Sequence, residues 1–243
     1  VSCALALLLL LILFHLLNNW LWRATNEVVF GFDRMFHQVT SLAYHNILSE
    51  GVNLHSLFSA LTWSDYYAPL VHLVAALFYK LFGVSMDVAA MSNSLFVVLF
   101  LVSVYGIGER FGPVPLGRAG RDGTGRRQLA GPWVGLLSAF VVSMLPIIFS
   151  MSRYLYVDFA LTAMVALNIC LLQRSERFQH RGYSLLYGLS LGLGRLTKWT
   201  FFAFTAAPLV AALASPAVVG AAWQALRPST WDGRRWLIAG LVG

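Results

Sequence analysis

The sequence TNEVVFGFDRMFHQVTSLAYHNILSEGVNLHSLFSALTWSDYYAPL, residues 25–70, is the one long polar interval in a chain that otherwise consists of apolar segments. It contains four of the ten acidic residues and three of the six histidines of the chain. Long segments without regular structure are uncommon in compact domains, so an interval of this length is expected to carry structure or a function of its own. The apolar segments on either side indicate the class of fold to which it belongs.

The composition is that of an integral membrane protein. Of the 243 residues, 58% are hydrophobic and 11% are charged, whereas a soluble domain carries about 25% charged residues. The net charge of +7 arises largely from arginines in short loops between apolar runs, which is typical of membrane proteins and does not indicate a nucleic-acid partner. Cys3 and Cys170 lie within apolar segments and have neither the number nor the spacing of a disulfide framework or a metal site.

Six apolar runs predict an all-α fold, a polytopic bundle of membrane helices. The first run is long enough to span a membrane, which takes about 20 residues, and no signal-peptide cleavage site follows it. The chain begins with Val1, and its last apolar stretch, residues 236–243, is too short to span, so we expect a fragment of a longer protein in which residues 1–243 form one transmembrane module. The six runs cover residues 3–22, 70–82, 88–107, 131–150, 159–172 and 183–214.

The distribution of charge predicts how the segments are oriented. Three arginine-rich loops are expected on the cytoplasmic side. The polar interval has one arginine and four acids, so we expect an outer loop over residues 23–83. Because the 88–107 helix must then start outside, the run 70–82 cannot cross and is expected to lie at the outer interface. The three cytoplasmic loops are residues 109–127, 174–181 and 227–235.

The alternation of inner and outer loops along the chain predicts three polar positions on the outer face. The first of them is Asp33. Asp33 and His37 are four residues apart, so on a helix they share a face and could bind a metal or act together on a proton. The alternative is a solvated aspartate near the start of a helix.

The second position is the junction around Arg153 and Asp158, whose flanking segments are almost wholly apolar. Ionisable residues at membrane depth are costly and indicate a functional site. Asp158 lies one step inside the expected start of its helix, where the helix dipole favours the ionised carboxylate. The alternative is an ion pair between Arg153 and Asp158 that merely fixes the turn.

The third position is the break in the last run, where Arg195 and Lys198 follow a glycine-rich stretch. The glycines of residues 188–194 allow close helix packing. The two cations have no acid near them in sequence, so an anionic group such as a lipid phosphate would suit them. The alternative is that both side chains extend to the membrane surface.

At these residues the chain resembles the GT-C glycosyltransferases, in the branch of the protein mannosyltransferases and ArnT-like enzymes. The resemblance spans nearly the whole chain and rests on the order of four motifs. They are Phe32-Asp33 with His37; Asp65-Tyr-Tyr-Ala-Pro-Leu-Val-His72, which leads into a short helix; Ser152-Arg-Tyr-Leu-Tyr-Val-Asp158; and Gly192-Leu-Gly-Arg-Leu-Thr-Lys198.

The resemblance implies an inverting glycosyltransferase that takes a sugar from a polyprenyl-phosphate donor. Asp33 would then be the general base and Asp158 would orient the acceptor or the base, while Arg153 and Lys198 would bind the donor phosphate. The other residues expected to bind substrate are His37, Tyr67, His72 and Arg195.

The expected setting is a multi-pass protein of a bacterial plasma membrane whose site faces the periplasm or exterior, in contact with membrane lipid. The acceptor is open: lipid, protein or polysaccharide. The family often has Asp-Glu in the first loop, but Arg34 follows Asp33 here, which leaves a single base as the simpler mechanism and leaves a divalent metal as an open question, with no cofactor assigned. Two other classes are a transporter or flippase for a lipid-linked anion and a non-catalytic membrane subunit.

Overall fold

The computed structural model of the chain describes residues 2–26, 32–49, 51, 53–63, 67–111 and 126–214. Within these ranges every regular element is a helix, which confirms the all-α fold. Two of the three arginine-rich loops expected in the cytoplasm lie largely outside the described residues, as do Asp65 and the apolar stretch 236–243. The helices are α1 (Ser2–Thr25), α2 (Phe32–Ser49), α3 (Leu54–Thr62), α4 (Leu70–Phe82), α5 (Met86–Ser92), α6 (Ser94–Phe111), α7 (Arg126–Ser143), α8 (Pro146–Met151), α9 (Val157–Arg174), α10 (Arg181–Arg195) and α11 (Phe201–Leu213).

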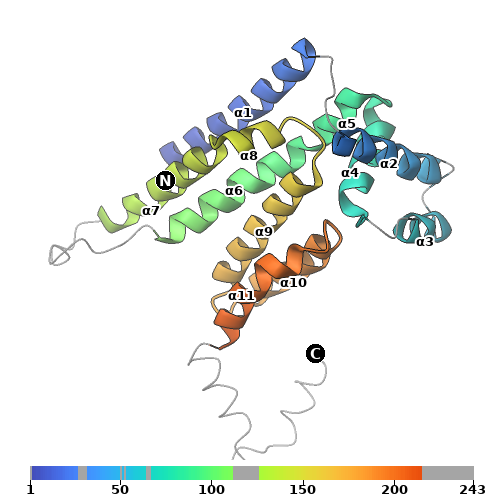
Figure 1. The fold of residues 1–243 in the computed structure, drawn as a ribbon. Helices are drawn as coiled ribbons and strands as arrows, with labels where there is room; N and C mark the ends of the chain where they lie inside the picture. The colour runs from blue at the N-terminus through green and yellow to red at the C-terminus, as the bar shows by residue number, and fades with distance from the viewer. Residues whose placement is uncertain are drawn as a thin grey trace, which may run out of the picture.

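The long helices lie side by side in a bundle with α6 at its centre (Figure 1). α6 packs against α1, α7 and α9, and α10 and α11 cover another side of α9. Within the described part of the chain, three helical segments are long and apolar enough to cross a membrane: Cys3–Thr25, Met86–Phe111 and Val157–Arg174. Large hydrophobic side chains remain exposed along α1 and the outside of the bundle, as expected for a surface that faces lipid.

Glycines bring α6 and α7 into close contact. A Cβ atom on Gly135 would lie 2.6 Å from the carbonyl oxygen of Tyr105, and one on Gly131 would lie 2.7 Å from that of Glu109. Lipid tails are as apolar as the helices, so helix association in a membrane depends on such close packing of small residues. The two backbones can approach this far because side chains are absent there.

The expected helix over residues 131–150 is wrong in its extent, because the run is divided into α7 and the short α8. Pro146 is the first residue of α8. A proline disfavours the helical conformation of the residue before it, and Leu145 accordingly has φ −58° and ψ 130°. The break turns the chain at the end of α7 and begins the segment that leads to Arg153 and Asp158.

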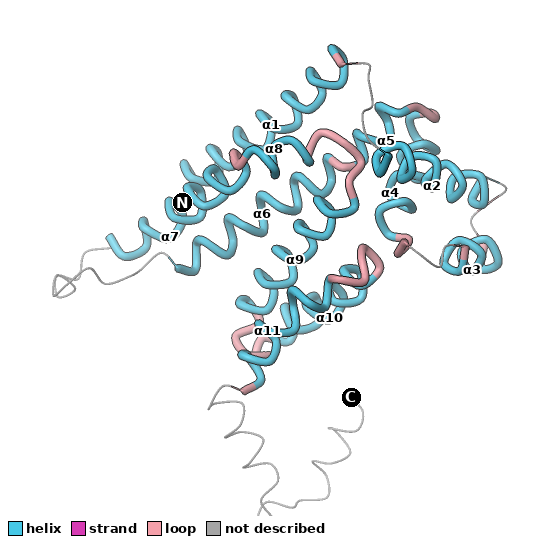
Figure 2. The backbone as a smooth tube through the Cα atoms, viewed as in Figure 1, coloured by secondary structure: helices cyan, strands magenta, loops and turns pink. Residues whose placement is uncertain are grey.

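The polar interval forms helices rather than an irregular loop (Figure 2). It contains α2 and α3. α3 starts with a reciprocal cap in which the Ser56 amide donates to Asn53 Oδ1 at 2.8 Å and the Asn53 amide donates to Ser56 Oγ at 2.9 Å. α2 packs on the 13-residue α4, and together with α3 and α5 these helices gather at one end of the bundle (Figure 1).

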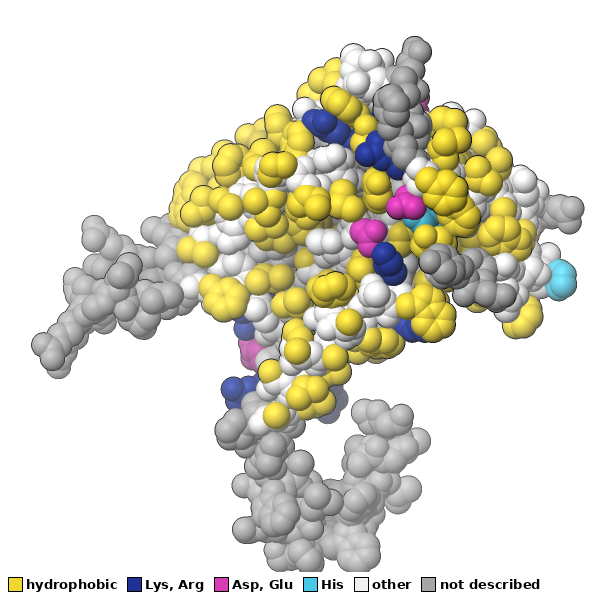
Figure 3. All heavy atoms as spheres, viewed as in Figure 1, with side chains coloured by type: hydrophobic (Ala, Val, Ile, Leu, Met, Phe, Trp, Pro, Cys, Tyr) yellow, Lys and Arg dark blue, Asp and Glu magenta, His cyan; other side chains and the backbone are white. Residues whose placement is uncertain are grey.

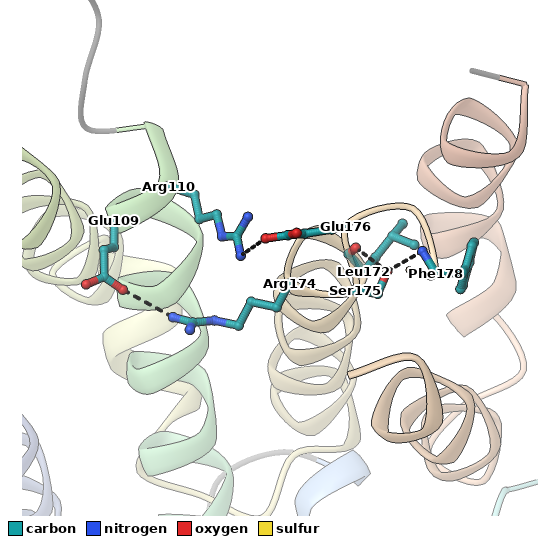
Figure 4. Close-up of polar contacts among 7 residues, drawn as sticks. All are labelled: Glu109, Arg110, Leu172, Arg174, Ser175, Glu176 and Phe178. Atoms are coloured by element: carbon teal, nitrogen blue, oxygen red, sulfur yellow. Dashed lines mark hydrogen bonds and ion pairs between the residues drawn. The ribbon is translucent and has the colours of Figure 1, made fainter. Parts of the chain in front are cut away.

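Ion pairs join the helix ends at the opposite end of the bundle (Figure 4). Arg174 Nη2 donates to Glu109 Oε2 at 3.2 Å, and Arg110 Nη2 donates to Glu176 Oε1 at 3.3 Å. These contacts connect the end of α6 to the end of α9. Two of the arginine-rich loops expected in the cytoplasm, 109–127 and 174–181, begin at this end, whereas α2, α3, α4 and α5 lie at the other end (Figure 1).

Candidate active site

Charged and aromatic side chains gather where α1 ends, α9 begins and the chain turns from α10 to α11. Figure 3 shows acidic, basic and histidine side chains close together between α2 and the start of α9, on a face that is otherwise largely hydrophobic. The sequence predicts that the regions of Asp33, Asp158 and Lys198 converge. In the structure Asp158 and Lys198 form an ion pair, and Arg34, the neighbour of Asp33, lies over Tyr154 in the turn before α9.

Asp158 and Lys198 form an ion pair. Lys198 Nζ donates to Asp158 Oδ1 at 2.5 Å, and the side chains are 48% exposed for Asp158 and 31% for Lys198. Asp158 is the second residue of α9, as predicted. The alternative pairing with Arg153 does not occur, because Arg153 Nη2 donates instead to Asn18 Oδ1 at 3.0 Å. The ion pair thus joins the second and third polar positions and stays accessible to a substrate.

Two buried asparagines fix the turn between α8 and α9. The carbonyl oxygen of Ser152 accepts hydrogen bonds at 3.1 Å from the Nδ2 atoms of Asn19 on α1 and Asn93 before α6. Both asparagines are fully buried. They hold the backbone that carries Arg153 against the central helices. Sequence reasoning missed them, although two polar residues next to apolar runs were a signal that could have found them.

Asp33 and His37 lie one turn apart on α2 but differ in exposure. Asp33 is exposed in the first turn, whereas His37 is 4% exposed. His37 Nδ1 lies 3.2 Å from Nε2 of His72 on α4. Burial lowers the pKa of His37 below its ordinary 6.5, against the opposing effect of the Asp33 and Asp158 charges. Asp33 is therefore the member of this pair that solvent or a substrate can reach.

His72 lies behind His37, away from the surface. Its side chain is fully buried, and burial together with the neighbouring His37 lowers its pKa to about 3. Both rings are consequently neutral near pH 7, and one of them donates an N–H to the other. Tyr67 completes this group, because its ring packs edge-on against His37 with 4.8 Å between ring centroids. The structure thus brings together three of the expected substrate-binding residues.

Arg34 extends toward the turn before α9. Its guanidinium carbon lies 3.5 Å from the centre of the Tyr154 ring and 5.5 Å from that of Tyr156. A guanidinium over an aromatic face is attracted by the ring quadrupole. In the sequence Arg34 stands out as a departure from a family pattern, and no spacing rule links it to Tyr154.

Arg195 lies over an aromatic ring at the end of α10. Its guanidinium carbon is 3.8 Å from the centre of the exposed Trp199 ring, and within the described chain it forms no ion pair. The Leu70 amide donates to the Leu196 carbonyl oxygen at 2.8 Å, which ties the start of α4 to the turn that carries Lys198. The structure thus joins the turn to the polar interval but does not pair Arg195 with the acids.

No group of three or more His, Cys, Asp or Glu side chains suited to a metal ion occurs within the described ranges. Asp33 and His37 alone do not make such a group, since His37 Nδ1 is directed at His72. The chemistry that this arrangement supports is proton transfer by an exposed carboxylate next to cations that can bind an anion.

The family model described as dolichyl-phosphate-mannose-protein mannosyltransferase matches residues 123–241. No curated protein and no solved structure shows a significant match to the chain. The matched segment contains Arg153, Asp158, Arg195 and Lys198. Asp33 and the histidine pair precede it.

Proposed function

We propose, from the premise that residues 123–241 belong to the dolichyl-phosphate-mannose-protein mannosyltransferase family, that this chain is the membrane module of an inverting glycosyltransferase with Asp33 as its general base. The family implies an integral membrane enzyme that uses a polyprenyl-phosphate-linked sugar.

The observation that carries the proposal is the meeting of acids and cations at one end of the bundle. Asp158 pairs with Lys198 at 2.5 Å, and Arg34, the neighbour of the exposed Asp33, lies over Tyr154, four residues before Asp158. Buried or half-buried charges in an apolar chain are costly and mark a functional site. A packing role alone would not need the exposed Asp33 carboxylate at the same end of the bundle.

The reaction is a single in-line displacement. Asp33 removes the proton from an acceptor hydroxyl while the acceptor oxygen attacks the anomeric carbon of the donor sugar. The bond between that carbon and the phosphate oxygen breaks, and its electron pair leaves with the polyprenyl phosphate. Attack from the side opposite the phosphate inverts the anomeric configuration. A positioned general base contributes about 10²- to 10⁴-fold to such a rate.

Fixed cations assist departure of the phosphate. Negative charge develops on the leaving oxygen, and preorganised positive groups in a water-poor site stabilise it strongly. Arg153 is the cation that we assign to this task; Lys198, which the family resemblance would also place there, is paired with Asp158. Asp158, held by Lys198, orients the acceptor or the base.

The proposed location of the site is the outer face of a bacterial plasma membrane. The support is the positive-inside rule, since the arginine-rich loops 109–127 and 174–181 begin at the end of the bundle that carries the Glu109–Arg174 ion pair. Helices α2 and α3 of the polar interval lie at the other end (Figure 1). An outer site also suits acceptors that are exported, whether lipid, protein or polysaccharide.

The test is a transfer assay with the full-length protein in proteoliposomes. A polyprenyl-phosphate sugar, radiolabelled in the sugar, is supplied with a mixture of membrane and wall acceptors, and both the acceptor fraction and the lipid are followed. We expect label in an acceptor and release of one polyprenyl phosphate for each sugar transferred. If the label stays on the lipid and crosses the bilayer intact, the protein is a transporter and the proposal fails.

A further inference from the structure

We propose that Arg34 and Arg153 together form the phosphate-binding subsite of this site, and that Lys198 serves Asp158 rather than the phosphate. The inference rests on the proposed function for the identity of the ligand, a phosphate group on a polyprenyl chain. It assigns a binding role to Arg34, a residue to which the proposed function gives none.

The two guanidinium groups stand on adjoining aromatic rings. Arg34 lies over Tyr154 at 3.5 Å, and Arg153 lies over Trp22 at 4.3 Å and over Phe149 at 4.5 Å. Trp22 Nε1 donates to the Tyr154 hydroxyl at 3.1 Å, so the two supporting rings are fixed to each other. The cations therefore share one platform at the end of α1 and the turn before α9.

Both cations have hydrogen-bonding capacity that the described residues do not use. The Nε atoms of Arg34 and Arg153 are buried and have no hydrogen-bond partner within the described ranges. Neither guanidinium has a carboxylate partner there, in contrast to Arg110, Arg174 and Lys198. A buried donor without an acceptor is costly. An anion bound between the two groups would satisfy both donors and their charge.

Phosphate is the anion that fits two stacked arginines. The planar guanidinium presents its N–H groups as a rigid fork that matches phosphate oxygens in pairs. Stacking on a ring limits the motion of the side chain. Lys198, in contrast, would have to leave its 2.5 Å contact with Asp158 to bind a phosphate.

The position of Arg34 next to Asp33 allows the two side chains to serve different groups. Consecutive residues of an α-helix point about 100° apart, so Asp33 and Arg34 extend in different directions from the same turn. Arg34 can therefore contact a phosphate while Asp33 contacts an acceptor hydroxyl. The base and the leaving-group site are thus set by neighbouring residues of one helix.

The experiment measures binding of sugar-free polyprenyl phosphate to the full-length protein in nanodiscs of zwitterionic lipid. We expect Arg34→Gln and Arg153→Gln each to weaken binding at least tenfold. Arg34→Lys should fall between wild type and Arg34→Gln, because lysine keeps the charge but lacks the fork. Lys198→Gln and the matched control Lys80→Gln, an exposed cation on α4, should stay within threefold of wild type.

Three results would overturn the assignment. The first is wild-type affinity in Arg34→Gln, and the second is a larger loss of affinity in Lys198→Gln than in either arginine variant. The third is equal competition by phosphatidylglycerol, which would make the platform a site for ordinary membrane phospholipid. Because the assay involves no sugar transfer, an inactive wild type that still shows this binding pattern would contradict the proposed function and leave the phosphate subsite standing.

Discussion

Lys198 donates to Asp158 at 2.5 Å, yet both side chains remain about one-third to one-half exposed. Ion pairs with this much access to solvent contribute about 0–1 kcal/mol to stability. The pair is therefore more important for where it holds the Asp158 carboxylate than for the stability of the bundle.

Asp158→Asn and Lys198→Gln should each lower the transfer rate by about 100- to 1,000-fold, as expected for loss of one positioned group at a charged site. The free energy of unfolding, measured by thermal denaturation in detergent, should change by no more than about 1 kcal/mol. Because the residues act as a pair, the double variant should be about as slow as the slower single variant. Losses that multiply in the double variant would show that the two residues act independently.

The histidine pair should make stability depend on pH. The pKa of His72 is lowered to about 3 in the folded protein and returns to 6.5 on unfolding. Between these values the unfolded chain binds more protons, so stability falls as the pH drops from 6.5 toward 3. The slope for one such group is at most about 1.4 kcal/mol per pH unit.

The measurement is the unfolding temperature between pH 7.5 and 4.5, and we expect the wild type to lose stability toward the acid side. His72→Gln should be less stable at pH 7.5 but should lose less on acidification. His55→Gln, on the exposed face of α3, is the matched control and should follow the wild type. If the unfolding temperature of His72→Gln fell with pH as steeply as that of the wild type, the histidine pair would not be the cause of the pH dependence.

At the level of helices, the turn between α10 and α11 depends on one glycine. A Cβ atom on Gly194 would clash with the ring of Phe201, which is fully buried at the start of α11, whereas Gly188 and Gly192 have open space around them. The glycine-rich sequence predicts close packing, and the structure restricts that packing to Gly194. Burial of Phe201 against it sets the direction of α11 and the position of Lys198 between the two helices.

Gly194→Ala should therefore displace the α10–α11 turn. Overpacking of this kind costs about 1–3 kcal/mol, and because Lys198 lies in the turn, the transfer rate should fall as well. Gly192→Ala, two residues earlier with no atom within 4 Å of the new Cβ, is the matched control and should be neutral or slightly stabilising. Equal behaviour of the two variants in unfolding and in transfer would contradict the packing described here.

Helix content and the polar nature of residues 25–70 follow from apolar periodicity and charge, so they could be predicted from the sequence. The division of residues 131–150 required the conformation imposed by Pro146, which the apolar pattern conceals. The Asp158–Lys198 pair joins residues 40 positions apart, and the stacking of Arg34 on Tyr154 joins two segments with no common motif. Such contacts arise from packing of distant helices, and no local rule specifies them.

At the scale of the whole molecule, the two ends of the bundle carry different groups of charged residues. The Glu109–Arg174 and Arg110–Glu176 pairs close one end (Figure 4), and the candidate site occupies the other. If the arginine-rich end is cytoplasmic, residues of α3 and of the turn after α9 face opposite sides of the membrane.

Single cysteines can test this orientation. In a Cys3→Ala background, where Cys170 is buried, His55→Cys on α3 should react with a membrane-impermeant maleimide in intact cells. Gln179→Cys, exposed in the turn after α9, should react only after the membrane is opened. The reverse pattern would place the candidate site in the cytoplasm and contradict the outer location.

The most direct test that Asp33 is the general base is the single-turnover transfer rate of Asp33→Asn, measured together with its affinity for polyprenyl phosphate. We expect a rate about 10²- to 10⁴-fold below wild type, because the amide cannot take the proton of the acceptor hydroxyl. The affinity should stay within threefold of wild type, because the phosphate subsite is intact. Asp87→Asn, an exposed acid in the first turn of α5, should transfer at the wild-type rate. Transfer by Asp33→Asn at more than a tenth of the wild-type rate would show that Asp33 is not the base.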